Sequence, residues 1–126
     1  MPAQERVGEF VNYVKSGRYI EALEEFYAHS ASARENLGEP RFGLPALIEH
    51  EKRTLAKLKM RTHAVGPMLI DGEWVAINWV FEMTLPDGSV HYLDELAIQK
   101  WQDGRIITEQ FYYDTSQLPQ PPRPRS

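Results

Sequence analysis

The feature that most constrains this chain is a set of three Asp-Gly pairs spaced sixteen residues apart: Asp71-Gly72, Asp87-Gly88 and Asp103-Gly104. Asp-Gly suits the two-residue turn of a β-hairpin, because that turn needs backbone φ angles above zero. Each pair lies between runs rich in β-branched and aromatic residues. The second half of the chain therefore predicts an antiparallel meander of four strands over Met60–Ile70, Glu73–Leu85, Ser89–Gln102 and Arg105–Asp114.

With each Asp-Gly pair at the tip of a hairpin, the side chains divide into two faces, because residues alternate along a strand. The predicted core face is strongly apolar and consists of Val75, Ile77, Trp79, Phe81, Met83, Tyr92, Asp94, Leu96, Ile98, Ile107, Glu109, Phe111 and Tyr113. Two of these residues, Asp94 and Glu109, are carboxylates. An ionised carboxylate among apolar groups is costly without a partner, so both are candidate functional residues.

The opposite face mixes polar and large apolar side chains, which suits a wet or partner-covered surface. Its predicted large apolar members are Trp74, Val80, Leu93, Trp101 and Tyr112. Aromatic enrichment of this kind is typical of interface cores. We therefore expect a homodimer that forms through this convex face of the sheet.

The first half of the chain predicts three helices, because apolar residues recur there at helical spacing. They cover Gln4–Lys15, Tyr19–Ala28 and residues 44–59, and a short strand or hairpin with a loop fills residues 29–42. Residues 1–115 then form one α+β domain, with helices packed on the concave face of a curved antiparallel sheet and a cone-shaped cavity between them. Residues 116–126 hold four of the nine prolines and predict an extended or disordered tail.

Composition excludes several classes of function. A net charge of −4 and the lack of a Lys/Arg cluster argue against a nucleic-acid partner. The absence of cysteine removes disulfides, thiolate metal sites and thiol nucleophiles. No apolar run reaches membrane-spanning length and no signal peptide is visible, so we expect a cytoplasmic protein. The sequence shows neither metal-ligand spacing nor a glycine-rich phosphate loop, so we expect no metal and no cofactor.

Several motifs together resemble the SnoaL-like branch of the NTF2-like (cystatin-like) superfamily over roughly residues 6–117. They are Ser16-Gly17-Arg18 after the first helix, Leu23–Tyr27, the segment Gly38–Gly43 before the third helix, and Glu95–Ile106 followed by Glu109 and Tyr113-Asp114. Relatives include polyketide cyclases, ketosteroid isomerase, scytalone dehydratase and limonene epoxide hydrolase. The resemblance implies a conical small-molecule cavity, and it implies that dimers through the sheet are common.

The resemblance also implies positions for site residues. Ketosteroid isomerase uses an Asp base, a Tyr donor and a protonated Asp donor. By motif these positions fall on Glu35, on Phe10, and near Leu96, with Asp94 two residues from the last. The candidate catalytic residues are Glu109, Asp94 and Glu35, and the candidate ligand-binding residues are Phe10, Trp79, Phe81, Leu96, Phe111 and Tyr113.

Two functions fit this pattern. The first is an enzyme that binds a mostly apolar small molecule and moves a proton by carboxylate chemistry, as in isomerisation, aldol-type cyclisation, dehydration or epoxide hydrolysis. The second is a non-catalytic dimeric binding module whose carboxylates are structural. A carboxylate deep in the cavity with a raised pKa favours the enzyme, and carboxylates all paired with Arg or Lys favour the binding module. For Glu109 we expect burial to raise the pKa.

Overall fold

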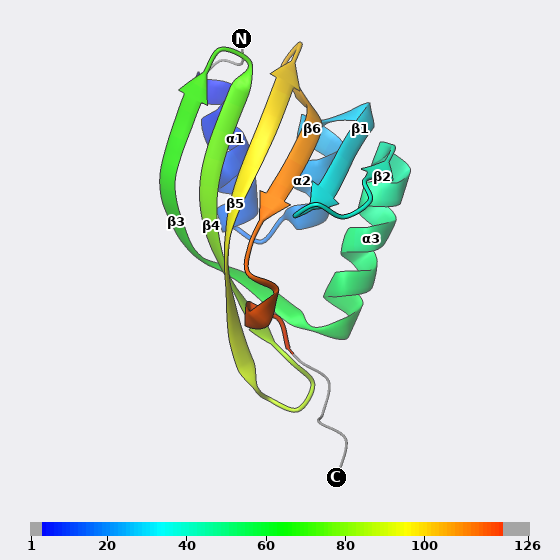
Figure 1. Ribbon diagram of the computed structural model, residues 1–126, viewed down its shortest axis with the longest axis vertical. Helices are drawn as coiled ribbons and strands as arrows, with labels where there is room; N and C mark the ends of the chain where they lie inside the picture. The colour runs from blue at the N-terminus through cyan, green and yellow to red at the C-terminus, as the bar shows by residue number, and fades with distance from the viewer. Residues whose placement is uncertain (1–3, 120–126) are drawn as a thin grey trace.

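A long curved sheet forms one layer of the protein, and three helices pack on its concave side (Figure 1). The structure is a computed structural model that describes residues 4–119. The elements in chain order are α1 (Gln4–Lys15), α2 (Tyr19–Phe26), β1 (Tyr27–Glu35), β2 (Arg41–Phe42), α3 (Leu44–Lys57), β3 (Lys59–Asp71), β4 (Trp74–Thr84), β5 (Val90–Gln102), β6 (Arg105–Tyr112) and the 3₁₀ helix η1 (Thr115–Gln117). The predicted α+β class is confirmed.

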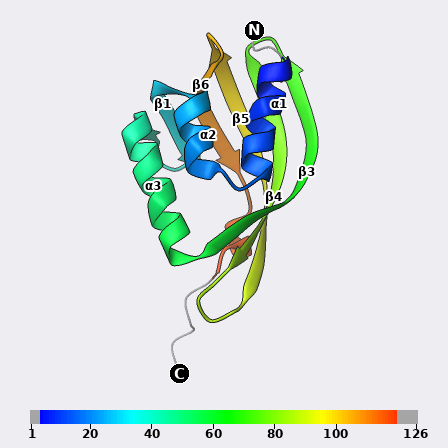
Figure 2. The same ribbon diagram turned by 180° about the vertical axis from the view of Figure 1, so that it is seen from behind.

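The helices pack through the apolar stripes that the sequence shows. Figure 2 shows α1 and α2 lying across the sheet, with α3 along one side of it. From α1, Val7, Phe10 and Val14 are buried. Helix α2 ends at Phe26, two residues before its predicted end, because Tyr27 already has extended backbone angles and begins β1.

The six strands form one sheet in the order β2-β1-β6-β5-β4-β3. The predicted meander of β3 to β6 is confirmed, and β1 and β2 pair as an antiparallel hairpin. The sheet is mixed rather than wholly antiparallel, because β1 runs parallel to β6. This pairing brings the first half of the chain against the last strand and so completes the floor of the cavity.

At two of the three Asp-Gly turns, the side chains of the two joined strands keep their predicted faces relative to each other. Asp103 and Gly104 both have positive φ, +53° and +74°, as a two-residue type I′ turn requires. At the first turn, Asp71 pairs with Trp74, so the loop is Gly72-Glu73. That loop displaces the expected register by two residues, and a displacement of two leaves the side chains on the same faces.

The middle turn differs, because it holds three residues rather than two. The Gly88 N–H donates to the Leu85 carbonyl at 2.9 Å, and Leu85 also pairs with Ser89 through a 2.9 Å hydrogen bond. Pro86 suits the second position of a type I turn, and Gly88, with φ +87°, suits the left-handed residue that follows such a turn. The extra residue shifts β5 by one position, which reverses every side chain on it.

The predicted faces of β5 are therefore wrong. Asp94 and Leu96, expected in the cavity, lie on the convex face, where Leu96 is 40% exposed. The residues that point inward and are buried are Leu93, Glu95, Ala97, Gln99 and Trp101. Leu93 and Trp101 therefore cannot belong to a convex interface, whereas Trp74 and Tyr112 remain exposed at 50% and 42%.

A bulge in β6 keeps the predicted position of Glu109. Lys100 pairs with Thr108, but Trp101 pairs with Ile106, which leaves Ile107 as the extra residue. Ile106 is consequently the fully buried isoleucine, in place of the expected Ile107. Beyond the bulge, Glu109 lies opposite Gln99 on the concave face.

The chain after β6 folds back on the domain instead of leaving it. The Asp114 carboxylate accepts the Ser116 N–H at 2.9 Å and starts η1. The Gln117 amide then accepts the Asp94 N–H at 2.9 Å and donates to the Asp94 carbonyl at 3.0 Å. The start of the predicted tail is thus ordered as far as Pro119, and residues 120–126 lie outside the described part. No helix in residues 4–119 is long and apolar enough to cross a membrane.

Candidate functional site

A cavity of about 620 Å³ lies between the concave face of the sheet and the helices. Its wall is mostly apolar and aromatic. Five of the six predicted ligand-binding residues line it: Phe10, Trp79, Phe81, Phe111 and Tyr113. Leu96 does not, because of the reversed face of β5. A volume of this size is typical of small-molecule sites.

Glu95 is the first of two buried carboxyls in the cavity wall. It projects from the middle of β5, opposite Trp79 on β4, and its residue surface is only 7% exposed. Among the described residues no hydrogen bond reaches its side chain. Burial raises the pKa of Glu95 to about 8, and the neighbouring charges of Glu109, Glu35 and Glu51 act in the same direction. Glu95 is therefore largely protonated at neutral pH.

Glu109 is the second buried carboxyl, at 5% exposure, and it is held from both sides. The Tyr27 hydroxyl donates to one oxygen, and Nε2 of Gln99 donates to the other at 2.7 Å. The Trp101 indole donates to Oε1 of Gln99 at 2.9 Å, which fixes the amide with its NH₂ group toward Glu109. Burial raises the pKa of Glu109 to about 7, although these two hydrogen bonds lower it in part.

Tyr27 is the first residue of β1, and it lines the cavity together with Glu109. Burial raises the pKa of its hydroxyl well above the ordinary value, and the charge of Glu109 adds to the effect. The hydroxyl therefore stays protonated over the range in which Glu109 titrates. Tyr27 and Glu109 can therefore share one proton at the cavity wall or transfer it to a ligand.

A second polar group lies where β1, β2 and α3 meet. Nη2 of Arg41 is 3.3 Å from a Glu35 oxygen, and His50 is 4.0 Å from the same oxygen. The Nε atom of Arg41 is buried without a hydrogen-bond partner within the described residues. Burial lowers the pKa of His50, with Arg41 adding to the effect, so His50 is neutral near pH 7. On the next position of α3, burial raises the pKa of Glu51.

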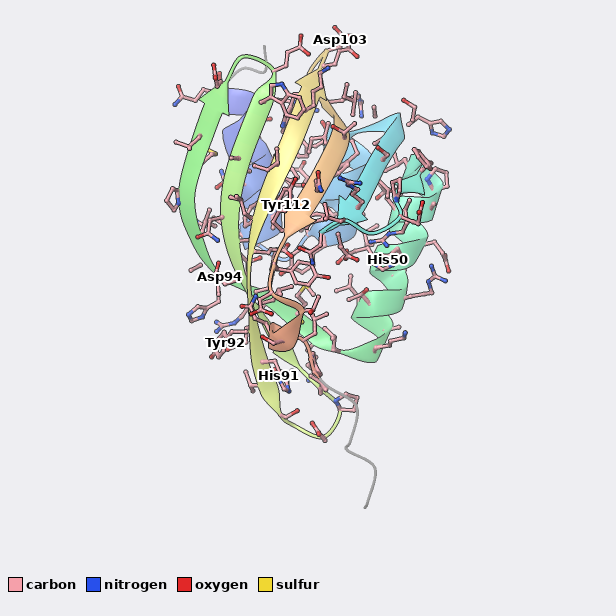
Figure 3. All side chains as sticks on the ribbon, in the orientation of Figure 1. His50, His91, Tyr92, Asp94, Asp103 and Tyr112 are labelled. Atoms are coloured by element: carbon pink, nitrogen blue, oxygen red, sulfur yellow. The ribbon has the colours of Figure 1, made fainter. Side chains whose placement is uncertain are left out.

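The structure brings together two of the three predicted catalytic carboxylates. Glu109 and Glu35 both line the cavity, while Asp94 lies outside it and accepts a 2.7 Å hydrogen bond from Asn78. In Figure 3, Asp94 projects from the β4–β5 pair away from α3, the helix that carries His50. The catalytic roles of Glu109 and Glu35 stay predictions, and Asp94 has no place in a site built in this cavity.

Sequence reasoning missed four further polar residues of the cavity wall, Glu95, Tyr27, Arg41 and Glu51, and it missed Gln99, which donates to Glu109. One signal could have found Glu95 and Gln99. Pro86 before Asp87-Gly88 favours the type I turn with its third residue, and that turn places both side chains inside. Within residues 4–119, no three His, Cys, Asp or Glu side chains are grouped closely enough to hold a metal ion.

No protein-family model matches the sequence, and no curated protein sequence matches it significantly. Solved structures do match the fold. A protein provisionally assigned as a SnoaL-like polyketide cyclase from Mesorhizobium loti shares 23% identity, covers 90% of this chain and 100% of its own, and has a TM-score of 0.76. TerC, co-crystallised with polyporic acid, shares 19% identity over 89% of this chain and 91% of its own, with a TM-score of 0.75.

A third similar structure is a hypothetical protein with a ketosteroid isomerase-like fold from Catenulispora acidiphila, in complex with trimethylamine. It shares 17% identity over 91% of this chain and 89% of its own, with a TM-score of 0.76. The chain thus has the SnoaL-like, NTF2-like fold that its motifs predicted. One fold hosts many chemistries, so the function must be argued from the cavity itself.

Proposed function

We propose that this protein is a small-molecule enzyme that moves a proton by carboxylate acid–base chemistry inside the cavity. Glu95 is the base, and the Tyr27–Glu109 pair is the hydrogen-bond donor to the oxygen on which charge develops. Isomerisation, aldol-type cyclisation and dehydration share such a step. The supporting observation is that an unpartnered buried carboxyl and a hydrogen-bonded carboxyl–phenol pair line one apolar cavity.

Two buried carboxyls whose pKa values lie near neutrality are what acid–base chemistry at physiological pH requires. With its pKa near 8, Glu95 in its ionised form is a stronger base than an exposed glutamate. At pH 7 about one molecule in ten carries this base. Within the described part of the chain, neither Glu95 nor Glu109 is paired with Arg or Lys. Such pairing would have indicated a purely structural role.

In this assignment Glu95 removes a proton from a carbon next to a carbonyl group. The negative charge passes to the carbonyl oxygen, and the Tyr27 hydroxyl donates its hydrogen to that oxygen in place of Glu109. Glu109 in its protonated form then donates to the Tyr27 oxygen. The apolar wall excludes water and so strengthens both interactions. The protonated Glu95 then returns the proton to another atom of the intermediate, which completes the transfer.

The test uses a probe that reports base strength in an apolar cavity. 5-Nitrobenzisoxazole opens to a coloured phenolate when a base removes the C3–H proton of its isoxazole ring and the N–O bond breaks. The wild-type protein should catalyse this opening, with a rate that rises through a midpoint near pH 8, the pKa of Glu95. Glu95→Gln should abolish the activity, whereas Glu24→Gln, at an exposed position on α2, should leave it unchanged.

Catalysis that is equal in Glu95→Gln and wild type would refute the assignment of the base. Catalysis by neither protein, with the probe shown to bind by quenching of Trp fluorescence, would instead favour a binding module without catalysis.

A further inference from the structure

The charges that line the cavity are unbalanced. Four carboxyl groups face it: Glu35, Glu51, Glu95 and Glu109. The basic residues among the lining are Arg41, His50 and Lys57, of which Arg41 already contacts Glu35 and His50 is neutral near pH 7. Lys57 is exposed at the last position of α3. Glu95, inside the cavity, therefore has no cationic partner among residues 4–119.

The wall around Glu95 is aromatic. Trp79 lies beside it on β4, and Tyr113 is close enough for the charge of Glu95 to raise its pKa. The other aromatic residues of the cavity are Phe10, Tyr19, Tyr27, Phe81 and Phe111. The faces of aromatic rings carry negative partial charge, so they attract cations, most strongly where water is excluded. The rings and the carboxyl thus favour the same sign of charge in a ligand.

An anion would meet the opposite conditions. The guanidinium of Arg41, which lines the cavity and is partly buried, lies next to Glu35, and its charge lowers the pKa of Glu51 in part. A carboxylate or phosphate placed there would approach two glutamates for one arginine. A neutral apolar ligand would fill the cavity but would leave Glu95 protonated and without a partner.

We propose that the ligand of this cavity is an apolar amine in its cationic form, with the ammonium group against Glu95 beside Trp79 and Tyr113. The hydrocarbon part of the ligand then packs against the remaining aromatic wall. This inference rests on the proposed function, because it takes the same cavity as the ligand site, and it names the class of molecule that enters.

Proton balance follows from this arrangement. Because burial raises the pKa of Glu95 to about 8, a bound cation at neutral pH displaces one proton from Glu95 to solvent. The affinity for a cation should then rise about tenfold per pH unit up to about pH 8 and level off above it. The titratable and charged groups around Glu95 come from four parts of the fold. They are Glu109 of β6 and Tyr113 just after it, Tyr27 of β1, Glu35 and Arg41 of the β1–β2 hairpin, and His50, Glu51 and Lys57 of α3. The other three carboxyls favour a cation as Glu95 does, and only Arg41 and Lys57 oppose it.

The test is a matched pair of probes, benzyltrimethylammonium and neopentylbenzene, which have the same shape and differ by nitrogen in place of carbon. Binding is measured by Trp fluorescence on either side of pH 8. The ammonium should bind at least about tenfold more tightly than the neutral probe above pH 8, and its advantage should shrink as the pH falls. Glu95→Gln should remove the preference, and Glu24→Gln should keep it.

Each other result overturns the proposal. Equal binding of the two probes, or a preference that survives Glu95→Gln, would mean that the cavity takes neutral ligands, and the proposed enzyme would still stand. Tighter binding of an anionic probe, phenylacetate, would mean that Arg41, and not Glu95, binds the charged group of the ligand. Binding of none of the three probes would count against the cavity as a ligand site, and thus against the proposed function too.

Discussion

Replacing Glu95 with glutamine should stabilise the fold near neutral pH. In the unfolded chain a glutamate ionises with a pKa of about 4.5, and in the folded protein burial raises that pKa to about 8. The unfolded state therefore binds fewer protons than the folded state between these values. Stability that is fully present below the unfolded pKa is then lost as the pH rises through the folded pKa.

The size of the loss follows from the two pKa values. Each pH unit between them costs about 1.4 kcal/mol, so Glu95 lowers the free energy of unfolding by about 3 kcal/mol at pH 7 and by up to about 5 kcal/mol above pH 8. Glutamine has nearly the same shape and cannot ionise. Because the Glu95 side chain has no hydrogen-bond partner among the described residues, the replacement breaks no such bond.

The assay is urea unfolding of wild type, Glu95→Gln and the exposed control Glu24→Gln across the pH range. The wild type should lose stability as the pH rises, and Glu95→Gln should lose about 1.4 kcal/mol per pH unit less. The control should follow the wild type. A Glu95→Gln variant as pH-sensitive as wild type, or less stable at pH 7, would refute the reasoning, because Glu95 would then be solvated or favourably paired.

The other predictions concern the neighbours of the site and the two faces of the sheet. Tyr27→Phe removes the hydroxyl that donates to Glu109, so the Glu109 pKa should rise above about 7, as a carboxyl NMR titration would show; an unchanged pKa would mean that the bond is not formed. Trp101→Ala should cost about 3–5 kcal/mol in thermal unfolding because Trp101 is fully buried, and Trp74→Ala, half exposed, should cost far less; equal losses would contradict the register of β5. If two copies pair through the convex face, Tyr112→Glu should shift the protein toward monomer in sedimentation. A wild-type monomer at micromolar concentration would exclude that dimer.

The sequence allows the meander to be predicted because hairpin turns are local. Asp103-Gly104 sets the register of β6 against β5 within a few residues, but Glu109 lies where its position predicts only because the bulge at Ile107 offsets the reversal of β5. The same locality explains the error in β5. Pro86 lengthens one loop by one residue, and this single residue moves Asp94 out of the cavity and Glu95 into it.

The rest of the site depends on contacts that local patterns do not encode. Tyr27 reaches Glu109 only because β1 runs parallel to β6, a pairing of strands about eighty residues apart in the chain. Glu35 contacts Arg41 across the β1–β2 hairpin and His50 on α3, through packing that no sequence period sets. The sequence therefore predicted the fold and one of the two buried carboxyls, Glu109. The polar groups around the two carboxyls come together only through the pairing of distant strands and the packing of α3.

The most direct test of the central claim is a ¹³C NMR titration of the Glu95 side-chain carboxyl in the intact protein. If Glu95 is buried in the cavity wall without a partner, its chemical shift should change with a midpoint near pH 8. A midpoint for Glu95 near its ordinary value of 4.5 would mean that the carboxyl is solvated or ion-paired at neutral pH. That result would contradict both the proposed base and the proposed cation site.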